Sequence, residues 1–212
     1  MKDIPVFTTE FGVAGLFLRE IPYQKTAYIR LFASQEPIKL LKECISFSRM
    51  VGAETIVATG DNILETYPLY TAVWTMSCGR DVLNDTDAAL WPVQEDTVSR
   101  FREIYNRKIS RIPGAAWMTA KEEEEMIKLG EGYFIHRGDA LLGIGRIRDD
   151  QILFLASLQK DAGADVVRAL AHAIPFDTVK LEVASANQKA VSLYERLGFI
   201  KTAETVRWYL VV

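Results

Sequence analysis

The stretch Val179–Phe199, VKLEVASANQKAVSLYERLGF, decides how the rest of this chain is interpreted. Apolar residues alternate with polar ones at its start, which predicts a strand over Val179–Val183. Apolar residues at helical spacing follow and predict a helix over Gln188–Leu197. Gly198 ends that helix, where a residue without Cβ is easily accommodated, and Phe199 is expected to pack beneath it. The segment is therefore a strand, a polar turn, a helix and a glycine stop.

Upstream of this stretch, short β-rich runs alternate with apolar residues at helical spacing. The sequence predicts strands over Val6–Thr9, Val13–Arg19, Ala27–Ala33, Thr55–Thr59, Val73–Cys78, Leu90–Val93, Tyr133–His136, Ala140–Ile147 and Ile152–Leu155, and a last one over Thr205–Val212. It predicts helices that begin at Glu36-Pro37, at Glu95-Asp96 (ending near Ile112), at Ala120 after a Thr119–Glu122 capping box, and at Gly163. The polar segment Gly79–Asp87 is expected to be a linker.

Composition limits the kind of protein this can be. The chain has 212 residues, of which 49% are hydrophobic and 25% charged, with a formal net charge of −3. These values suit one large globular domain or two small ones. The sequence has no basic stripe of the kind that indicates nucleic-acid binding. It also has no uncharged run that approaches the roughly 18 residues of a membrane helix. The first ten residues lack the apolar core of a signal peptide, and the two cysteines are too few for a disulfide scaffold, so we expect a cytoplasmic protein.

The chain also contains a weak internal repeat. Moved forward by 125 positions, the expected strand Ala27–Ala33 falls on 152–158, Thr55–Thr59 falls on 180–184, and Asn62 falls on Asn187. The order hairpin, strand, helix, strand and Asn is then the same in both halves. Coincidence is the alternative, because any two α/β units share an element order. The constant offset favours a duplication in which the first copy lacks the leading strand and two helices.

The C-terminal stretch resembles the acetyl-CoA-binding end of the GNAT (GCN5-related N-acetyltransferase) family. The matching residues, with the family's spacing, are Leu181-Glu182-Val183, Asn187, Ala190, Leu193-Tyr194-Glu195 and Leu197-Gly198-Phe199. The resemblance covers Leu90–Val212 and implies an α/β fold with a mixed central sheet and flanking helices. Together with the repeat, it predicts a truncated, non-catalytic GNAT-like copy over residues 1–80 and an acetyltransferase domain over residues 88–212.

The resemblance further implies a site where two parallel strands splay apart. The pantetheine arm of acetyl-CoA would pair with the backbone of the strand that ends in Phe154, Leu155, Ala156 and Ser157. Asn187 would hydrogen-bond the pantetheine amides, unless it only caps the helix that follows. Tyr194 would protonate the departing CoA thiolate as a general acid, unless it is only a core aromatic.

The family's pyrophosphate loop is only half matched. The aligned residues are Lys160, Asp161, Ala162, Gly163, Ala164 and Asp165. Gly163 is in place, but Asp165 stands where a small residue is expected, and two carboxylates would repel a pyrophosphate. Either the loop still binds phosphate through its N–H groups, or it is an ordinary acidic helix start and CoA affinity is lost. In the first copy, Gln35–Ile38 has no glycine and Pro37 lacks an N–H, so we predict no cofactor there.

The sequence does not mark a general base. Glu182 is the first candidate. Strand alternation, however, places its side chain on the opposite face of the strand from Leu181 and Val183, and one of these two faces is core. Ser185 and His136 are alternatives, and His172 is interpreted as structural. No metal site is expected, because the cysteines lack metal-ligand spacing.

Taken together, these features predict transfer of an acetyl group from acetyl-CoA, as co-substrate, to a primary amine by direct attack. The acceptor would be a small molecule or a peptide, and the protein would be a monomer or weak homodimer without nucleic-acid or membrane partners. The alternative is a non-catalytic GNAT-like module that binds acyl-CoA or another protein.

Overall fold

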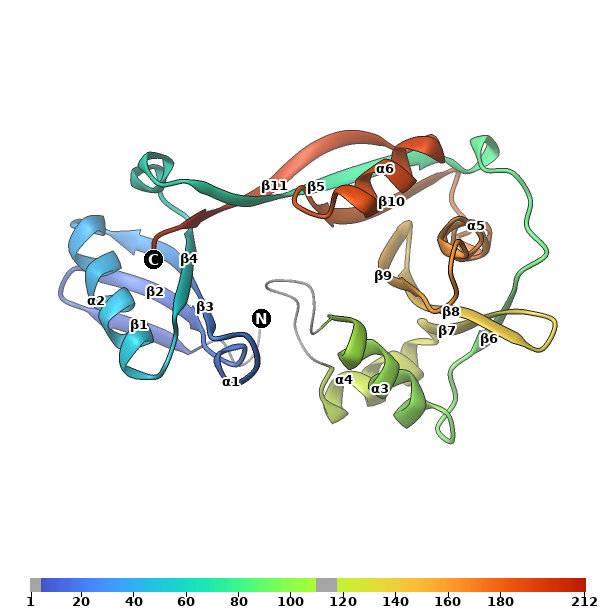
Figure 1. Cartoon of the computed structure of the whole chain (residues 1–212), viewed down its shortest axis with the longest axis horizontal. Helices are drawn as coiled ribbons and strands as arrows, with labels where there is room; N and C mark the ends of the chain where they lie inside the picture. Colours follow the sequence, from blue (N-terminus) through green and yellow to red (C-terminus); the bar gives the residue numbers. More distant parts are fainter. Residues whose placement is uncertain (1–4, 110–117) are drawn as a thin grey trace. The chain divides into compact units, whose positions relative to one another are not determined.

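The computed structural model describes residues 5–109 and 118–212, except for the side chain of Tyr23. The chain divides into two compact units. The first unit comprises Met1–Val73 and Thr205–Val212, and the second comprises Trp74–Glu204. Both contain an α/β arrangement of strands and helices, whose labels are those of Figure 1.

The first unit is a mixed sheet with one long helix packed on it. A hairpin of two antiparallel strands leads into a third strand, which pairs in parallel with the fourth. Its elements are β1 (Val6–Thr9), β2 (Gly12–Phe17), α1 (Ile21–Gln24), β3 (Thr26–Ser34), α2 (Pro37–Met50), β4 (Thr55–Thr59), the 3-10 helix η1 (Asn62–Thr66) and the first part of β5 (Leu69–Gly79).

One face of α2 supplies much of the first unit's core. Leu40, Leu41 and Cys44 are fully or nearly fully buried against apolar residues of β2, β3 and β4. Their spacing of three and four residues places them on one side of the helix. Burial raises the pKa of the Cys44 thiol to about 11.

Glu20 is a buried carboxyl group in the first unit. It is 3% exposed, and neither carboxyl oxygen has a hydrogen-bond partner among the described residues. Burial raises its pKa, an effect that the charge of Arg19 only partly offsets. A carboxyl group with a raised pKa contributes stability below its ordinary pKa and loses it as the pH rises through the pKa of the folded state.

Glu20→Gln is therefore expected to stabilise the protein at pH 7.5 by about 1 kcal/mol, because the amide carries no charge that must be desolvated. At pH 4 the gain should largely vanish, since the wild-type carboxyl is then protonated. Urea unfolding of both proteins at the two pH values measures the difference. A gain of equal size at pH 4 would contradict the raised pKa of Glu20.

The second unit contains the elements that the resemblance predicted, in the expected order. They are the second part of β5, the 3-10 helix η2 (Arg80–Val82), β6 (Ala89–Pro92), α3 (Val98–Ile109), α4 (Ala120–Leu129), β7 (Gly132–Arg137), β8 (Ala140–Arg148), β9 (Gln151–Ser157), α5 (Gly163–Ala173), β10 (Thr178–Ala184), α6 (Gln188–Arg196) and the first part of β11 (Ile200–Leu210). The expected capping box of α4 is present: Thr119 accepts from the Glu122 N–H, and the Glu122 carboxylate accepts from the Thr119 N–H.

Helices cover both faces of the second unit's sheet (Figure 1). The buried side chains of α5 and α6 form one core with β10 and with Ile135, Leu142 and Ile152 of the neighbouring strands. Those of α3 and α4 form a second core with Phe134 and Ile144. The strand order from one edge is β6-β7-β8-β9-β10, followed by β5 and β11. The expected mixed central sheet with flanking helices is thus confirmed.

Two glycines let α5 approach this sheet closely. A Cβ on Gly143 would lie 2.6 Å from Val166 Cγ2, and one on Gly145 would lie 2.3 Å from Leu170 Cδ1. Both distances are shorter than side-chain contacts allow, so any larger residue would push the helix away. These two glycines therefore serve the close packing of α5 on the sheet.

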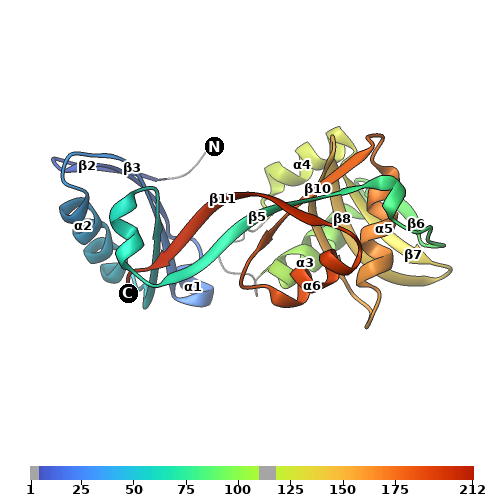
Figure 2. The ribbon, with the colours of Figure 1, turned by 90° about the horizontal axis from the view of Figure 1, so that it is seen from above.

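Two long strands, β5 and β11, run side by side and each is divided between the units (Figure 2). Within the first unit, the end of β11 pairs antiparallel with β4 through Tyr209 with Ala58 and Leu210 with Val57. Within the second unit, β5 is the strand next to β10. Each half of the chain therefore supplies one strand to the sheet that the other half began.

Several predicted boundaries are corrected by this arrangement. The strand β5 begins at Leu69, earlier than the expected Val73, and β11 begins at Ile200, earlier than Thr205, because both strands serve two units. The expected linker Gly79–Asp87 is held on the fold, since Arg80 donates to the Ile174 carbonyl at 2.9 Å. The divisions between the two compact units fall inside β5 and β11.

The third helix, α3, begins three residues later than expected. A turn in which the Gln94 N–H donates to Thr97 Oγ1 precedes it, and Val98 is its first residue. The expected end near Ile112 lies outside the described residues. None of the helices in the described ranges is both long and apolar enough to span a membrane.

Candidate active site

The parallel strands β9 and β10 separate shortly after they meet. Their register holds only for Gln151 with Lys180 and Ile152 with Leu181, although β9 continues to Ser157 and β10 to Ala184. The other edge of β9 stays paired with β8 through Ser157 and Gly143. The main chain from Leu153 onward is therefore unpaired by β10, and the carboxyl ends of the two strands diverge. We call the region between these ends the β9–β10 cleft.

The pairing of β9 with β8 is interrupted at the mouth of this cleft. Arg146 is opposite Phe154, whereas the next residue, Ile147, is opposite Ile152, so Leu153 has no partner on β8. Leu153 is 39% exposed. Such a bulge twists a strand and changes the direction of its N–H and C=O groups. Phe154 and Ala156 then pack against the α3–α4 core, while Leu155 packs against the α5–α6 core.

The loop from Lys160 to Asp165 connects β9 to α5 and forms an anion-binding shape. Asp161 has a left-handed φ of +62°, and Ala162, next to it, has right-handed angles. This alternation directs successive N–H groups toward one point, as in backbone anion nests. The first turn of α5 adds the N–H groups of Gly163, Ala164 and Asp165, which have no acceptor in the described part of the chain.

Gly163 lies close to a side chain of α6. A Cβ at this position would lie 2.9 Å from Leu193 Cδ2. The start of α5 and the middle of α6 are therefore in close contact, which places the loop beside the helix that carries Tyr194.

The carboxylate of Asp165 is neutralised by two arginines. Arg137 Nη2 lies 3.0 Å from it and Arg168 Nη1 lies 3.7 Å from it, and Thr86 donates at 3.4 Å. Arg137 also binds Asp87 at 2.7 Å, and its hydrogen bonds to Asp87 and Asp165 raise its pKa. The repulsion that the sequence predicted between Asp165 and a pyrophosphate is thus reduced, by an arginine on the β7–β8 hairpin that sequence reasoning missed.

Asn187 is the N-cap of α6. Its Oδ1 accepts from the Ala190 N–H at 3.2 Å, so the capping interpretation of this residue holds. An asparagine amide has a second end, and Asn187 Nδ2 donates to no acceptor within the described ranges. Asn187 is exposed and lies three residues after the end of β10. The cap bond to Oδ1 thus fixes the Asn187 side chain, while its NH₂ group stays able to donate.

Tyr194 is buried on the inner face of α6. It is 7% exposed, and its ring lies 5.9 Å from the ring of Phe199, which is itself 1% exposed. Burial raises the pKa of Tyr194 to about 12, so its hydroxyl stays protonated at physiological pH. The expected packing of Phe199 beneath the helix is confirmed, and Gly198, with a φ of +94°, makes the turn between them.

The three candidate bases do not converge. Glu182 is exposed on β10, while Leu181 and Val183 on either side are buried, as alternation predicted. Ser185 follows the end of β10. His136 lies on β7, which β8 separates from β9. Its ring packs against the ring of Trp91, with 5.4 Å between the two ring centroids. Glu182 and Ser185 therefore lie on or just after β10, which borders the β9–β10 cleft, whereas His136 is two strands away from β9.

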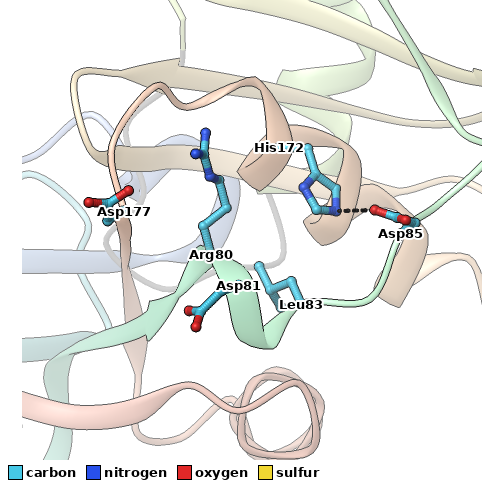
Figure 3. A pocket seen from close by; sticks show the side chains of 6 residues that line it. All are labelled: Arg80, Asp81, Leu83, Asp85, His172 and Asp177. Atoms are coloured by element: carbon cyan, nitrogen blue, oxygen red, sulfur yellow. Dashed lines mark ion pairs between the residues drawn. The ribbon is translucent and has the colours of Figure 1, made fainter.

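A cavity of about 580 Å³ lies at the other end of β10 (Figure 3). His172 in the last turn of α5 faces Asp85, with 3.9 Å between Nε2 and Oδ1, and Asp177 directly precedes β10. In this view, the Arg80 side chain lies between Asp177 and His172. This cavity contains none of the predicted site residues. Within residues 5–109 and 118–212, no three His, Cys, Asp or Glu side chains are grouped to hold a metal ion.

Comparison with known proteins places this arrangement in a fold class. No protein-family model matches the chain, and no curated protein matches its sequence. A GCN5-related N-acetyltransferase from Sphaerobacter thermophilus is similar in structure, with a TM-score of 0.53 at 11% identity over 93% of this chain and 75% of that one. The chain therefore has the fold of the GCN5-related N-acetyltransferases, as its C-terminal stretch predicted.

Two further solved structures are similar over nearly the whole chain. One is a tandem GNAT protein from the clavulanic acid biosynthesis pathway, with a TM-score of 0.53, 12% identity and coverage of 93% of this chain and 78% of that chain. The other is a protein of unknown function from Staphylococcus epidermidis, with a TM-score of 0.58, 11% identity and coverage of 99% and 94%. Such likeness extends across both units.

Proposed function

We propose that the second unit binds acetyl-CoA in the β9–β10 cleft and transfers its acetyl group to a primary amine. The observation that carries this proposal is the loss of pairing between β9 and β10 after Ile152 and Leu181. The anion-binding loop precedes α5, and Tyr194 lies on the helix that follows β10. A thioester with a phosphate at one end and an acyl group at the other matches this set of groups.

Each group has a distinct part in binding. The unpaired main chain of Phe154, Leu155, Ala156 and Ser157 would pair with the pantetheine amides, as an added strand does. Asn187 Nδ2 would donate to a pantetheine carbonyl. The N–H groups of Lys160–Asp165 would hold the pyrophosphate, whose charge the start of α5 favours. Lys160, which is exposed, adds a positive charge at the same place.

The chemistry needs a proton donor and a polarised carbonyl. An amine that attacks the thioester expels a thiolate, and the neutral Tyr194 hydroxyl would protonate it. Main-chain N–H groups at the bulge of β9 would stabilise the oxyanion of the tetrahedral intermediate. Glu182 remains the proposed base. We further propose a small-molecule or peptide acceptor, a monomer or weak homodimer, and a cytoplasmic location.

The first unit is proposed to lack a cofactor. An offset of 125 positions brings β3, α2 and β4 onto β9, α5 and β10, which supports a duplication. However, β3 and β4 stay paired from Thr26 with Thr55 as far as Arg30 with Thr59, so they form no cleft. The helix α2 starts at Pro37, which has no N–H to offer a phosphate.

Acetyl-CoA at a hundredfold excess over its Kd is expected to stabilise the protein by about 2.7 kcal/mol, measured by thermal unfolding. Lys160→Glu should weaken binding about tenfold or more, because it adds a carboxylate beside the pyrophosphate. The exposed Lys42→Glu on α2 is the matched control and should change nothing. No stabilisation at millimolar acetyl-CoA would overturn the proposal. Stabilisation without thiol release across a panel of amines would favour a non-catalytic binding module.

A further inference from the structure

A second cavity of the second unit, of about 440 Å³, lies along one face of α3. We call it the α3 pocket. The five α3 residues that line it recur at spacings of three, four, seven and eight, so they share one side of the helix. Its lining residues are Arg100, Glu103, Ile104, Arg107, Lys108, Leu141 and Leu158.

The α3 pocket is cationic in a protein whose net charge is −3. Three positive side chains line it against one carboxylate, that of Glu103. Arg100 has no ion-pair partner among the described residues, and Lys108 donates to a main-chain carbonyl, which leaves its charge uncompensated. Such a cavity favours an anion, and guanidinium groups suit carboxylate and phosphate oxygens in particular.

Lys108 connects the α3 pocket to the β9–β10 cleft. Its Nζ donates at 2.8 Å to the carbonyl of Ser157, the last residue of β9. Leu158, the next residue, lines the pocket directly. An acceptor anchored there would therefore lie beside β9, the strand along which acetyl-CoA is proposed to bind.

The α3 pocket and the pyrophosphate loop lie on opposite faces of the sheet. Leu141 and Leu158 pack with the α3–α4 core, whereas α5 belongs to the core on the other face (Figure 1). The phosphates of CoA are assigned to the start of α5. The anion in the α3 pocket must then come from the second substrate.

We infer that the α3 pocket binds a carboxylate or phosphate group of the acceptor, so the acceptors are amines that also carry an anionic group. This inference rests on the proposed acetyl transfer. It names Arg100 and Lys108 as the residues that select the acceptor, and it predicts poor activity toward amines without an anionic group.

Matched acceptor pairs test it: an amino acid against its amide, and phosphoethanolamine against ethanolamine, with thiol release as the readout. In the wild type, at least one anionic member should have a kcat/KM about tenfold or more above its neutral partner, mainly through KM. Arg100→Gln and Lys108→Met should bring that ratio close to one and leave the KM for acetyl-CoA unchanged. Lys128→Gln, exposed on α4 and outside the pocket, is the control and should keep the ratio.

The outcomes separate the two proposals. Stabilisation by acetyl-CoA with equal kcat/KM for both members of each pair would overturn this inference and leave the transferase proposal standing. Weaker acetyl-CoA binding in Arg100→Gln with an unchanged acceptor ratio would assign the pocket to a CoA phosphate and also overturn it. Absence of acetyl-CoA binding would overturn both.

If acetyl-CoA binds but no amine of the panel reacts, inorganic phosphate alone decides. NMR shifts confined to α3 amides and Leu158, and lost in Arg100→Gln, would support the α3 pocket as an anion site. No shift at millimolar phosphate would overturn it.

Discussion

Tyr194→Phe is expected to lower the turnover of acetyl transfer by about 100- to 10,000-fold, the usual contribution of general acid catalysis. The ring of Tyr194 is buried beside Phe199, and phenylalanine fills the same space, so the fold should be preserved. Only the hydroxyl, whose proton stays bound up to a pH of about 12, is removed. Thiol release under saturating acetyl-CoA measures the effect.

The affinity for acetyl-CoA separates an acid from a packing residue. Calorimetric titration of Tyr194→Phe should give a Kd within about twofold of the wild type, because the proton donor acts in the transition state. Phe199→Leu serves as the packing control and should reduce stability more than turnover. Equal losses of affinity and turnover in Tyr194→Phe would contradict the acid role.

Glu131→Ala is expected to lower the free energy of unfolding by about 3–5 kcal/mol, the usual result of removing one partner of a buried ion pair. Glu131 is 3% exposed, and it accepts from Arg146 at 2.7 Å and from Arg148. The Arg146 side chain is only 15% exposed, so its charge would remain nearly buried without a partner. Urea unfolding measures the loss. Lys39→Ala, which breaks an exposed ion pair with Glu36, should cost less than about 1 kcal/mol.

The stabilisation by Glu131 should depend on pH. Burial alone would raise its pKa, but hydrogen bonds from Arg148 and Arg146 outweigh burial and hold the pKa below its ordinary value. A lowered carboxyl pKa gives stability that is present above the ordinary value, about 4.3, and is lost as the pH falls through the folded pKa. The difference between wild type and Glu131→Gln should therefore shrink from pH 7 toward pH 3. A difference that grows on acidification would contradict this account.

The sequence predicts most of the local structure because the responsible forces are local. Alternation at Leu181, Glu182 and Val183 sets which side chains face the core, and the Thr119–Glu122 pair starts α4 by satisfying its own N–H groups. The tight turn at Gly198 and the packing of Phe199 follow from the same short stretch. Even the splayed strands could be expected, since the resemblance concerned the residues that border them.

The rest depends on residues that are distant in sequence. The end of β11 pairs with β4 at Tyr209 and Ala58, and β5 lies next to β10. No local sequence pattern shows which of these two similar strands pairs with which neighbour. The compensation of Asp165 requires Arg137, 28 positions earlier, on a hairpin that folds beside α5. The donor to Ser157 is Lys108, a residue that reads in the sequence as one of several surface bases. Three-dimensional proximity, not residue type, gives these side chains their roles.

A crystal structure with acetyl-CoA bound would test the central proposal most directly. The proposal predicts pantetheine paired with the main chain of residues 154–157, the pyrophosphate on the N–H groups of residues 161–165, and the sulfur within hydrogen-bonding distance of the Tyr194 hydroxyl. Acetyl-CoA bound elsewhere, with its phosphates in the α3 pocket or beside Arg80 and its thioester away from Tyr194, would contradict it.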